Sequence, residues 1–241
     1  MLADELIQLL GDAIQAAPPF SKESEVHVAL ALGLRLRGVG RIWASKTVSD
    51  SLGDPSIRRT RIVGLTKYPD LSWATGQDGP MPDVIGQIKF AGSLQPTQEP
   101  ALYLGDIAFA GLDFARLKAG EFFTAAVIEK VRFRRYWGHL VSAQGGTFTL
   151  VLDPSSCKVD EIDGRTWVSP EGIARPYTRG DYNRIFCAGT NGKFLGLWHR
   201  PGTFTIVTDT RCRETEKYWV LLHVVRQARL DSELPLELWW P

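Results

Sequence analysis

Three residues whose side chains suit metal or phosphate chemistry occur within one short stretch of the sequence. Asp70 follows a proline in the segment YPDLSWATG, and Gln87 and Lys89 lie in DVIGQIKF with one residue between them. Carboxylate and amide oxygens bind Mg²⁺, and an ammonium group can stabilise the negative charge of a scissile phosphate. The spacing therefore predicts a site for phosphodiester hydrolysis, with Asp70 and Gln87 as Mg²⁺ ligands. The backbone carbonyl of Ile88 is a further candidate ligand.

The two segments that carry these residues must pair as a hairpin if the side chains are to meet. Residues 70–76 and 83–90 flank the polar stretch QDGPMP, which is a pattern typical of a β-hairpin. With the turn centred near residues 79 and 80, Asp70 lies across from Lys89. Gln87 and Lys89 share one face of their strand because side chains alternate between the two faces.

Two alternatives compete with this hypothesis. Asp83 also follows a proline, but four extended residues span about 13 Å, so Asp83 and Gln87 are too far apart to hold one ion. Asp70 is therefore the better ligand. The second alternative is an ordinary hairpin in which Asp70 and Lys89 form a salt bridge on a solvent-exposed face, without any metal.

The arrangement resembles the PD-(D/E)xK nuclease superfamily, which includes many restriction enzymes and repair nucleases. In that family an aspartate on one strand is followed by Glu-x-Lys or Asp-x-Lys on the next, and a preceding helix usually carries a glutamate. Here Asp70 corresponds to the aspartate, QIK replaces the second motif, and Glu25 corresponds to the helix glutamate. The resemblance covers about residues 21–135. It implies that Asp70, Gln87, Lys89 and Glu25 are catalytic, although the amide of Gln87 removes one negative charge from the site.

The predicted elements of the first half fit a sheet flanked by helices. Apolar residues recur at helical spacing, and helices are expected at residues 2–16, 23–38 and 100–120. Strands are expected at residues 41–48, 59–67, 70–76, 83–90 and 121–137. The predicted fold class is α+β or α/β, with a restriction-endonuclease-like mixed sheet in the N-terminal half and a β-rich C-terminal half.

The character of the chain changes after about residue 141. From there on, short strand-like segments alternate with turns rich in Gly, Pro, Asn and Asp. We therefore predict a helix-flanked nuclease-like domain over residues 1–141. Residues 142–241 are predicted to serve recognition or assembly, either as a β-rich subdomain or as an extension of the first sheet.

Basic residues gather in two places, although the net charge of the chain is only +1. Eight basic and two acidic residues lie between Arg35 and Lys67, and a second cluster lies at residues 130–135. Such clusters favour a phosphate-bearing partner, unless they are solvated faces balanced by acids elsewhere. The candidate nucleic-acid-binding residues are Arg58, Arg59, Arg61, Lys130, Arg132, Arg134, Arg135 and Trp137.

Composition argues against several classes of protein. The chain has 44% hydrophobic and 23% charged residues, which is ordinary for a soluble globular protein. Its apolar stretches are shorter than the roughly 18 residues of a membrane-spanning helix, and acids stand where a secretory signal would carry lysines. A cytoplasmic location and no membrane partner are expected. The widely spaced Cys157, Cys187 and Cys212 predict neither a disulfide framework nor a zinc site.

The histidines on apolar faces, His27 and His223, are interpreted as buried core residues. The favoured function is then a Mg²⁺-dependent endonuclease of the restriction or antiviral-defence type, acting on DNA rather than RNA. The alternative is a non-catalytic nucleic-acid-binding subunit of a larger complex, such as a CRISPR-type effector. A nuclease fold without activity and an adaptor that binds only protein stay open as well. A homodimer or a subunit of a multiprotein complex is compatible with these functions.

Overall fold

A computed structural model describes residues 3–54, 57–59, 65, 69–76, 81–92, 99–133, 137–141, 146–152, 167–168 and 203–231. The helices are α1 (Ala3–Ala16), α2 (Glu23–Leu36), α3 (Lys46–Leu52), α4 (Glu99–Leu117), α5 (Lys130–Arg132) and the 3₁₀ helix η2 (Gly138–Leu140). The strands are β1 (Arg41–Ala44), β2 (Ile57–Arg59), β3 (Leu71–Ala74), β4 (Val84–Ala91), β5 (Glu121–Glu129), β6 (Thr147–Leu152), β7 (Trp167–Val168), β8 (Thr203–Glu214) and β9 (Tyr218–Asp231).

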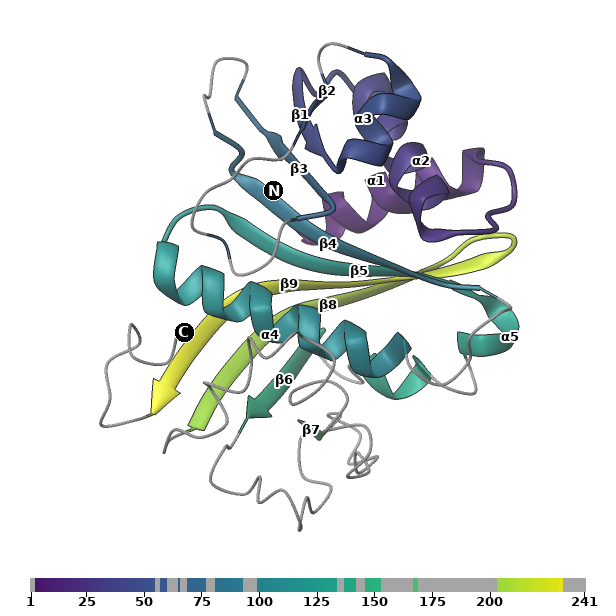
Figure 1. The fold of residues 1–241 in the computed structure, drawn as a ribbon. Helices are drawn as coiled ribbons and strands as arrows, with labels where there is room; N and C mark the ends of the chain where they lie inside the picture. The colour runs from purple at the N-terminus through teal and green to yellow at the C-terminus, as the bar shows by residue number, and fades with distance from the viewer. Residues whose placement is uncertain are drawn as a thin grey trace.

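The strands form one mixed sheet in the order β2-β1-β3-β4-β5-β9-β8-β6-β7. Neighbours β1, β3 and β4 are antiparallel, whereas β4 and β5 are parallel. Parallel strands need a long crossover, and α4 supplies it. Helices α1 to α3 lie on one side of the sheet and α4 lies on the other (Figure 1). The predicted mixed α/β architecture with N-terminal helices and a β-rich C-terminus is confirmed.

The core consists of two apolar layers, one on each face of the sheet. Strand β5 contributes to both, since every residue from Phe122 to Ile128 is buried. Phe123 faces α1 and α2, whereas Phe122 faces α4. A strand that is covered on both faces needs a continuous apolar sequence, and this accounts for the run FFTAAVI.

The N-terminal helices form where the apolar spacing predicts them. Leu6, Leu10 and Ile14 of α1 recur at helical spacing and are buried. In α2, Val26 and Leu30 are buried in the same layer. The prediction of helices near residues 2–16, 23–38 and 100–120 is confirmed, with ends that differ by a few residues.

Two predicted strands end earlier than expected. Residues 46–52 form α3 instead of prolonging the strand at 41–48, because Val48 packs into the core one helical turn from Leu52 and the left-handed Gly53 ends the helix. Strand β5 ends at Glu129, and α5 follows. The predicted strand at 121–137, which would have aligned basic side chains on one face, is therefore wrong at residues 130–133 and at Trp137, and residues 134–136 lie outside the described part of the chain.

The described strands of the second half continue the same sheet. Strand β9 pairs with β5 over Phe123–Glu129 and with β8 along most of its length. The division at residues 141 and 142 stays a prediction about sequence organisation. Of the three cysteines, Cys157 and Cys187 lie outside the described residues, and Cys212 is a half-buried free thiol.

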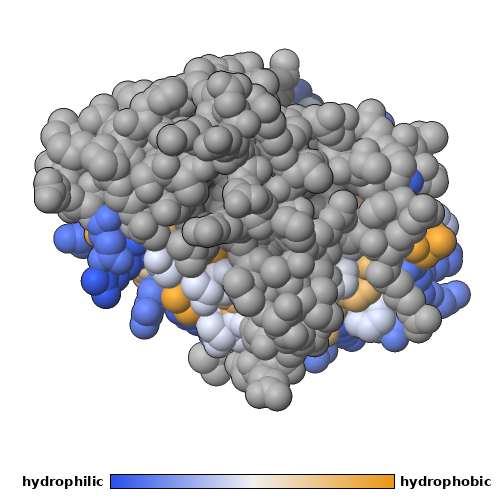
Figure 2. All heavy atoms as spheres, turned by 90° about the horizontal axis from the view of Figure 1, so that it is seen from below, coloured by the Kyte–Doolittle hydropathy of each residue, from blue (hydrophilic) through white to orange (hydrophobic). Residues whose placement is uncertain are grey.

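One face of the molecule shows the surface character of some described residues. In the view of Figure 2, the described residues carry mostly hydrophilic side chains, and apolar ones appear in small separate groups. Within the described part of the chain, no helix has both the length and the apolar composition needed to span a membrane.

Candidate metal centre

The hairpin of β3 and β4 forms as predicted, but its register differs by two residues. Leu71 pairs with Gly86, and the N–H of Asp70 donates to the Gly86 carbonyl oxygen at 3.0 Å. Asp70 therefore lies across from Gln87 and not across from Lys89. A shift of one residue would have reversed the faces, but a shift of two preserves them. Asp70, Gln87 and Lys89 therefore still lie on one face of the hairpin, as predicted, although the predicted register is wrong.

Asp83 serves the far end of this hairpin. Its carboxylate accepts the N–H of Thr75 at 2.8 Å, and its own N–H donates to the Trp73 carbonyl oxygen at 3.1 Å. These bonds join the two strands next to the turn. Asp83 thus has a structural role, in keeping with its rejection as a ligand.

Strand β4 continues past the start of β3, and along this edge, where no described strand pairs with it, the polar groups of the site gather. The N–H of Ile88 donates to Asp70 Oδ2 at 2.8 Å, and the N–H of Phe90 donates to Glu23 Oε2 at 3.3 Å. On the same edge, His27 Nε2 lies 3.3 Å from the Ile88 carbonyl oxygen. Two carboxylates and an imidazole therefore replace the strand that would otherwise cover these backbone groups.

Glu23, His27 and Asp70 each offer a ligand atom, and these atoms lie within 4.8 Å of one another. Glu23 and His27 are one helical turn apart on α2, so they project from the same face of that helix. His27 is buried, whereas the two acids are half-buried and reachable from solvent. Carboxylate oxygens and an imidazole nitrogen, with a main-chain carbonyl beside them, are donors that a divalent cation accepts.

The contact between His27 and Ile88 defines the tautomer of the ring. A carbonyl oxygen only accepts, so His27 Nε2 carries the proton and donates it to this oxygen. A metal ion needs the lone pair of a ring nitrogen. Binding through Nε2 therefore requires His27 to change to the tautomer that is protonated on Nδ1.

Lys89 lies between the helices on the two faces of the sheet. Its Nζ is 3.5 Å from Glu23 Oε1 and 3.4 Å from Asp106 Oδ2 of α4. Burial of the amine lowers its pKa, and Asp106 is the largest influence in the opposite direction. Asp70 and Glu23 act with Asp106, so the pKa of Lys89 is raised above its ordinary value. Lys89 is therefore an ammonium ion at neutral pH.

Acidic groups outnumber basic groups among the described side chains that contact Lys89. The carboxylates of Glu23, Asp70 and Asp106 surround its ammonium group, and these four groups together carry a formal charge of −2. A divalent ion bound at Glu23 and Asp70 would reduce this negative charge.

Gln87 lies two residues before Lys89, so both side chains are on the same face of β4. This is the face that α4 covers and on which Ile85 also lies. The residue is almost fully buried, with 6% of its surface exposed. It pairs in register with Thr124 of β5. Sequence position and strand parity therefore bring Gln87 beside the cluster, where it stays the predicted amide ligand.

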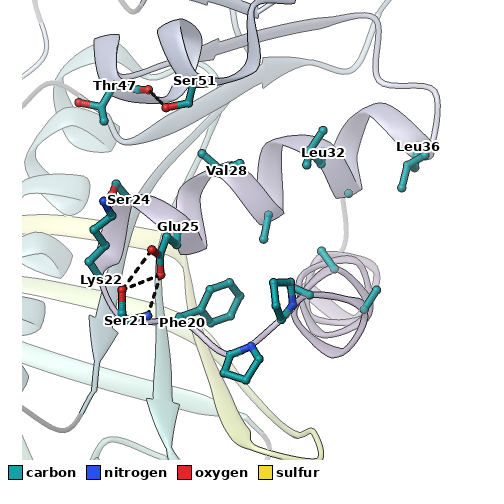
Figure 3. Close-up of a pocket in the computed structure, with 17 residues that line it drawn as sticks. Phe20, Ser21, Lys22, Ser24, Glu25, Val28, Leu32, Leu36, Thr47 and Ser51 are labelled. Carbon is teal, nitrogen blue, oxygen red and sulfur yellow. Dashed lines mark hydrogen bonds between the residues drawn. The ribbon is translucent and has the colours of Figure 1, made fainter.

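Glu25 does not lie with these residues. Its carboxylate accepts the N–H of Ser21 at 2.7 Å and also contacts the Ser21 hydroxyl (Figure 3). The hydrogen bond from the Ser21 backbone is the main reason why the pKa of Glu25 is lowered. Glu25 lines a separate cavity of about 740 Å³ between α1, α2 and α3, whose apolar wall includes Val28 and Leu32.

Helical geometry explains why Glu23 takes the place that the resemblance gave to Glu25. Two residues along a helix differ by about 200° in direction, so these glutamates project from nearly opposite sides of α2. Glu23 precedes Val26, His27 and Leu30 by three, four and seven residues, and all three are buried. This spacing was visible in the sequence and marks Glu23 as the acid on the buried face.

The first basic cluster is partly neutralised within the fold. Arg35 pairs with Asp54 at 3.3 Å. Arg58 is exposed on the edge strand β2, where a phosphate could reach it, and Arg59 follows it in the same strand. Outside the described residues lie Arg61, Arg134 and Arg135.

The second basic cluster contributes less surface than the sequence suggested. Lys130 pairs with Glu214 at 2.7 Å, and Arg132 is only 8% exposed. Trp137 is completely buried and packs against Tyr103, with ring centroids 5.4 Å apart. Trp137 is thus a core residue whose ring no base can reach in this structure. Its position next to arginines did not reveal this burial.

Comparisons with models of protein families, with curated proteins and with solved structures find no match to this chain. Its function is therefore inferred from the residues that meet at the edge of β4. Those residues come from three elements and from the residue preceding β3, and they combine acidic, imidazole and ammonium groups.

Proposed function

We propose that this protein is a metal-dependent nuclease of the PD-(D/E)xK type that hydrolyses phosphodiester bonds, with DNA as the expected substrate. One observation carries the proposal. Glu23, His27 and Asp70 converge at the edge of β4 beyond its pairing with β3, and the ammonium of Lys89 contacts the same Glu23. Metal ligands beside a positively charged side chain are what metal-assisted phosphodiester hydrolysis uses.

The order of the elements supports the same family. Helix α2 precedes β1, β3 and β4, and α4 then leads to β5. Strands β1, β3 and β4 are antiparallel neighbours, and β5 is parallel to β4. This agrees with the helix, three strands, helix and strand that the resemblance implies, apart from the insertion of α3 and β2.

In the proposed mechanism, some side chains would bind the metal ion, and Lys89 would stabilise negative charge on the phosphate. Glu23, His27 and Asp70, with the Ile88 carbonyl, would hold the ion, and Gln87 beside them stays the predicted amide ligand. A bound divalent ion would supply Lewis-acid chemistry, neutralising charge on the phosphate and activating water. Hydrolysis adds a water oxygen to phosphorus and breaks one phosphorus–oxygen ester bond. Lys89 would stabilise the negative charge that develops, because its raised pKa keeps it charged and prevents it from acting as a base.

The donor set bears on the choice of ion. The sequence predicts Mg²⁺, which prefers oxygen ligands alone. An imidazole among the ligands suits Mn²⁺ and other transition metals better than it suits Mg²⁺. We therefore extend the predicted cofactor from Mg²⁺ to Mg²⁺ or Mn²⁺.

Cleavage of supercoiled plasmid DNA and of a labelled RNA, each with Mg²⁺ and with Mn²⁺, tests the proposal. We expect the unmodified protein to cut DNA and Lys89→Ala to lose at least about a hundredfold in rate while it still binds DNA. The matched control is Lys217→Ala, because Lys217 is exposed in the turn between β8 and β9. The proposal fails if the unmodified protein cuts neither nucleic acid with either ion.

One feature of the site favours a second function, a nucleic-acid-binding subunit without catalysis. Gln87 stands where the family has a carboxylate, so the site holds one anionic ligand fewer than the family pattern. Under this alternative, the protein binds DNA at low salt concentration, its affinity for DNA falls as the salt concentration rises, and it cleaves neither DNA nor RNA. A filter-binding titration at several salt concentrations, run beside the cleavage assay, separates the two functions.

A further inference from the structure

Two carboxylates on different helices share the ammonium of Lys89. Glu23 of α2 lies 3.5 Å from Lys89 Nζ, and Asp106 of α4 lies 3.4 Å from it on the other side of the sheet. The side chain of Asp106 is only 3% exposed and that of Lys89 is 14% exposed. Asp106 thus approaches the centre from an element that supplies none of its candidate ligands.

The carboxylate of Glu23 contacts Lys89 and would also bind the proposed metal ion. Its Oε1 atom is the one that contacts Lys89 Nζ, and the same atom lies 4.0 Å from His27 Nε2. An ion held between Glu23 and His27 would therefore occupy the side of the carboxylate that Lys89 now contacts. Two cations on one oxygen repel each other, so ion binding and the contact between Glu23 and Lys89 oppose each other.

We propose that Asp106 is a positioning residue of the metal centre, which retains the Lys89 ammonium when Glu23 turns to the ion. The inference rests on the proposed function, since it needs an ion at Glu23, His27 and Asp70. Asp106 acts through Lys89 and touches neither the ion nor the substrate.

The charges predict what each partner does to ion binding. Without Asp106, Lys89 has Glu23 and Asp70 as its remaining anions, so it competes more strongly with the ion. Without Lys89, the ion no longer competes with that ammonium for Glu23. Two unit charges several Å apart interact strongly enough, at an effective dielectric constant near 20, to change affinity by roughly tenfold or more.

Helix α4 offers a matched control for Asp106. Asp113 lies seven residues further along the same helix, is 5% exposed, and pairs with Arg116 at 3.9 Å. Changing Asp113 to Asn removes a buried carboxylate from α4 without altering the surroundings of Lys89. It therefore reports how much a general weakening of α4 affects the centre.

The experiment measures Mn²⁺ binding to the full-length protein from the electron paramagnetic resonance signal of free Mn²⁺. We expect Asp106→Asn to weaken binding about tenfold and Lys89→Met to strengthen it about tenfold. In the Lys89→Met background, Asp106→Asn should change the dissociation constant less than about threefold, because the residue through which it acts is gone. Asp113→Asn should stay within about threefold of the unmodified protein. Circular dichroism of every variant verifies folding.

Equal weakening by Asp106→Asn in both backgrounds, or the same effect from Asp113→Asn, would overturn the inference. If Asp106→Asn does not fold, the Lys89→Met variant still tests the inference. Unchanged or weaker Mn²⁺ binding by Lys89→Met would contradict competition between Lys89 and the ion for Glu23. Absence of Mn²⁺ binding to the unmodified protein would refute the inference and the metal centre together. If the coupling appears but no nucleic acid is cut, only the proposed function fails. Cleavage without the coupling refutes only the inference.

Discussion

The carboxylate of Asp70 accepts a hydrogen bond from the main-chain N–H of Ile88 at 2.8 Å. This bond holds Asp70 against the edge of β4 at the point where β3 no longer covers it. The carbonyl of the same Ile88 faces His27. One residue of β4 thus orients an acid and an imidazole, and the candidate site depends on how this hairpin is held.

Replacing Asp70 with Asn should abolish cleavage while the fold is kept. The amide removes the anionic ligand and turns one hydrogen-bond acceptor into a donor. We expect a rate loss of at least about a hundredfold in single-turnover cleavage of duplex DNA with Mn²⁺. Asp83→Asn is the control, because Asp83 binds Thr75 at the other end of the hairpin. Equal losses of cleavage rate in both variants would show that Asp70 affects cleavage only by stabilising the hairpin, and not as a metal ligand.

Glu23 and Glu25 should differ in metal binding, although they are two residues apart. Mn²⁺ that binds only the folded state raises the melting temperature. We expect Mn²⁺ to stabilise both the unmodified protein and the Glu25→Gln variant, because the Glu25 carboxylate is hydrogen-bonded to Ser21 and lies apart from the metal centre. Glu23→Gln should show little or no Mn²⁺-dependent shift. The opposite result would restore the role that the family resemblance assigns to Glu25.

A methyl group added at Gly86 should destabilise the strand that carries Gln87 and Lys89. A Cβ atom there would overlap the ring of Phe123 on β5. Overpacking of this kind costs about 1–3 kcal/mol in the free energy of unfolding. Gly76→Ala is the control, since nothing lies within 4 Å of the position of its added Cβ. Urea unfolding of both variants measures the difference, and equal stabilities would contradict the packing described here.

Stability should fall in mild acid because of His223. This residue is completely buried, as the sequence predicts; its Nε2 lies 3.1 Å from the Leu140 carbonyl oxygen, and its Nδ1 lies 2.8 Å from the Tyr103 hydroxyl. Burial lowers the pKa of His223 to about 3, although the hydrogen bond to Leu140 opposes the shift. Below about pH 6.5 the unfolded chain gains a proton at this position that the folded chain does not bind.

The free energy of unfolding should therefore decrease between about pH 6.5 and pH 3, and His223 should contribute up to about 1.4 kcal/mol per pH unit. Above pH 6.5 this contribution is complete and constant. Urea unfolding at pH 7.5, 6.0 and 5.0 tests this expectation against His223→Gln, which cannot take up the proton. Identical pH slopes for the two proteins would mean that His223 is not held neutral.

Strand periodicity made part of the site predictable from the sequence. Asp70 and Lys89 lie close enough to interact because side chains alternate along paired strands, and this parity survived a two-residue error in register. The register itself depends on the geometry of the connection between β3 and β4, in which residues 77–80 lie outside the described part of the chain. The motif QDGPMP does not determine that geometry, because several turn lengths fit the same residues.

Other parts of the site depended on tertiary contacts. Asp106 belongs to a helix that is remote in sequence, and only the crossover between β4 and β5 brings it to Lys89. Trp137 resembled a stacking platform beside arginines, yet it fills the core next to Tyr103. His27 is buried as expected for an apolar helix face, but that face meets the edge of β4 and not only apolar residues. Glu23 was the exception, because its helical spacing to buried residues was available in the sequence.

X-ray diffraction from crystals soaked in Mn²⁺, with data collected near the manganese absorption edge, tests the central claim most directly. We predict one strong anomalous peak within ligand distance of Glu23, His27 and Asp70, beside the Ile88 carbonyl. The peak should disappear in Asp70→Asn crystals. No peak at this site at millimolar Mn²⁺, or a peak that persists unchanged without the Asp70 carboxylate, would contradict the proposed metal centre.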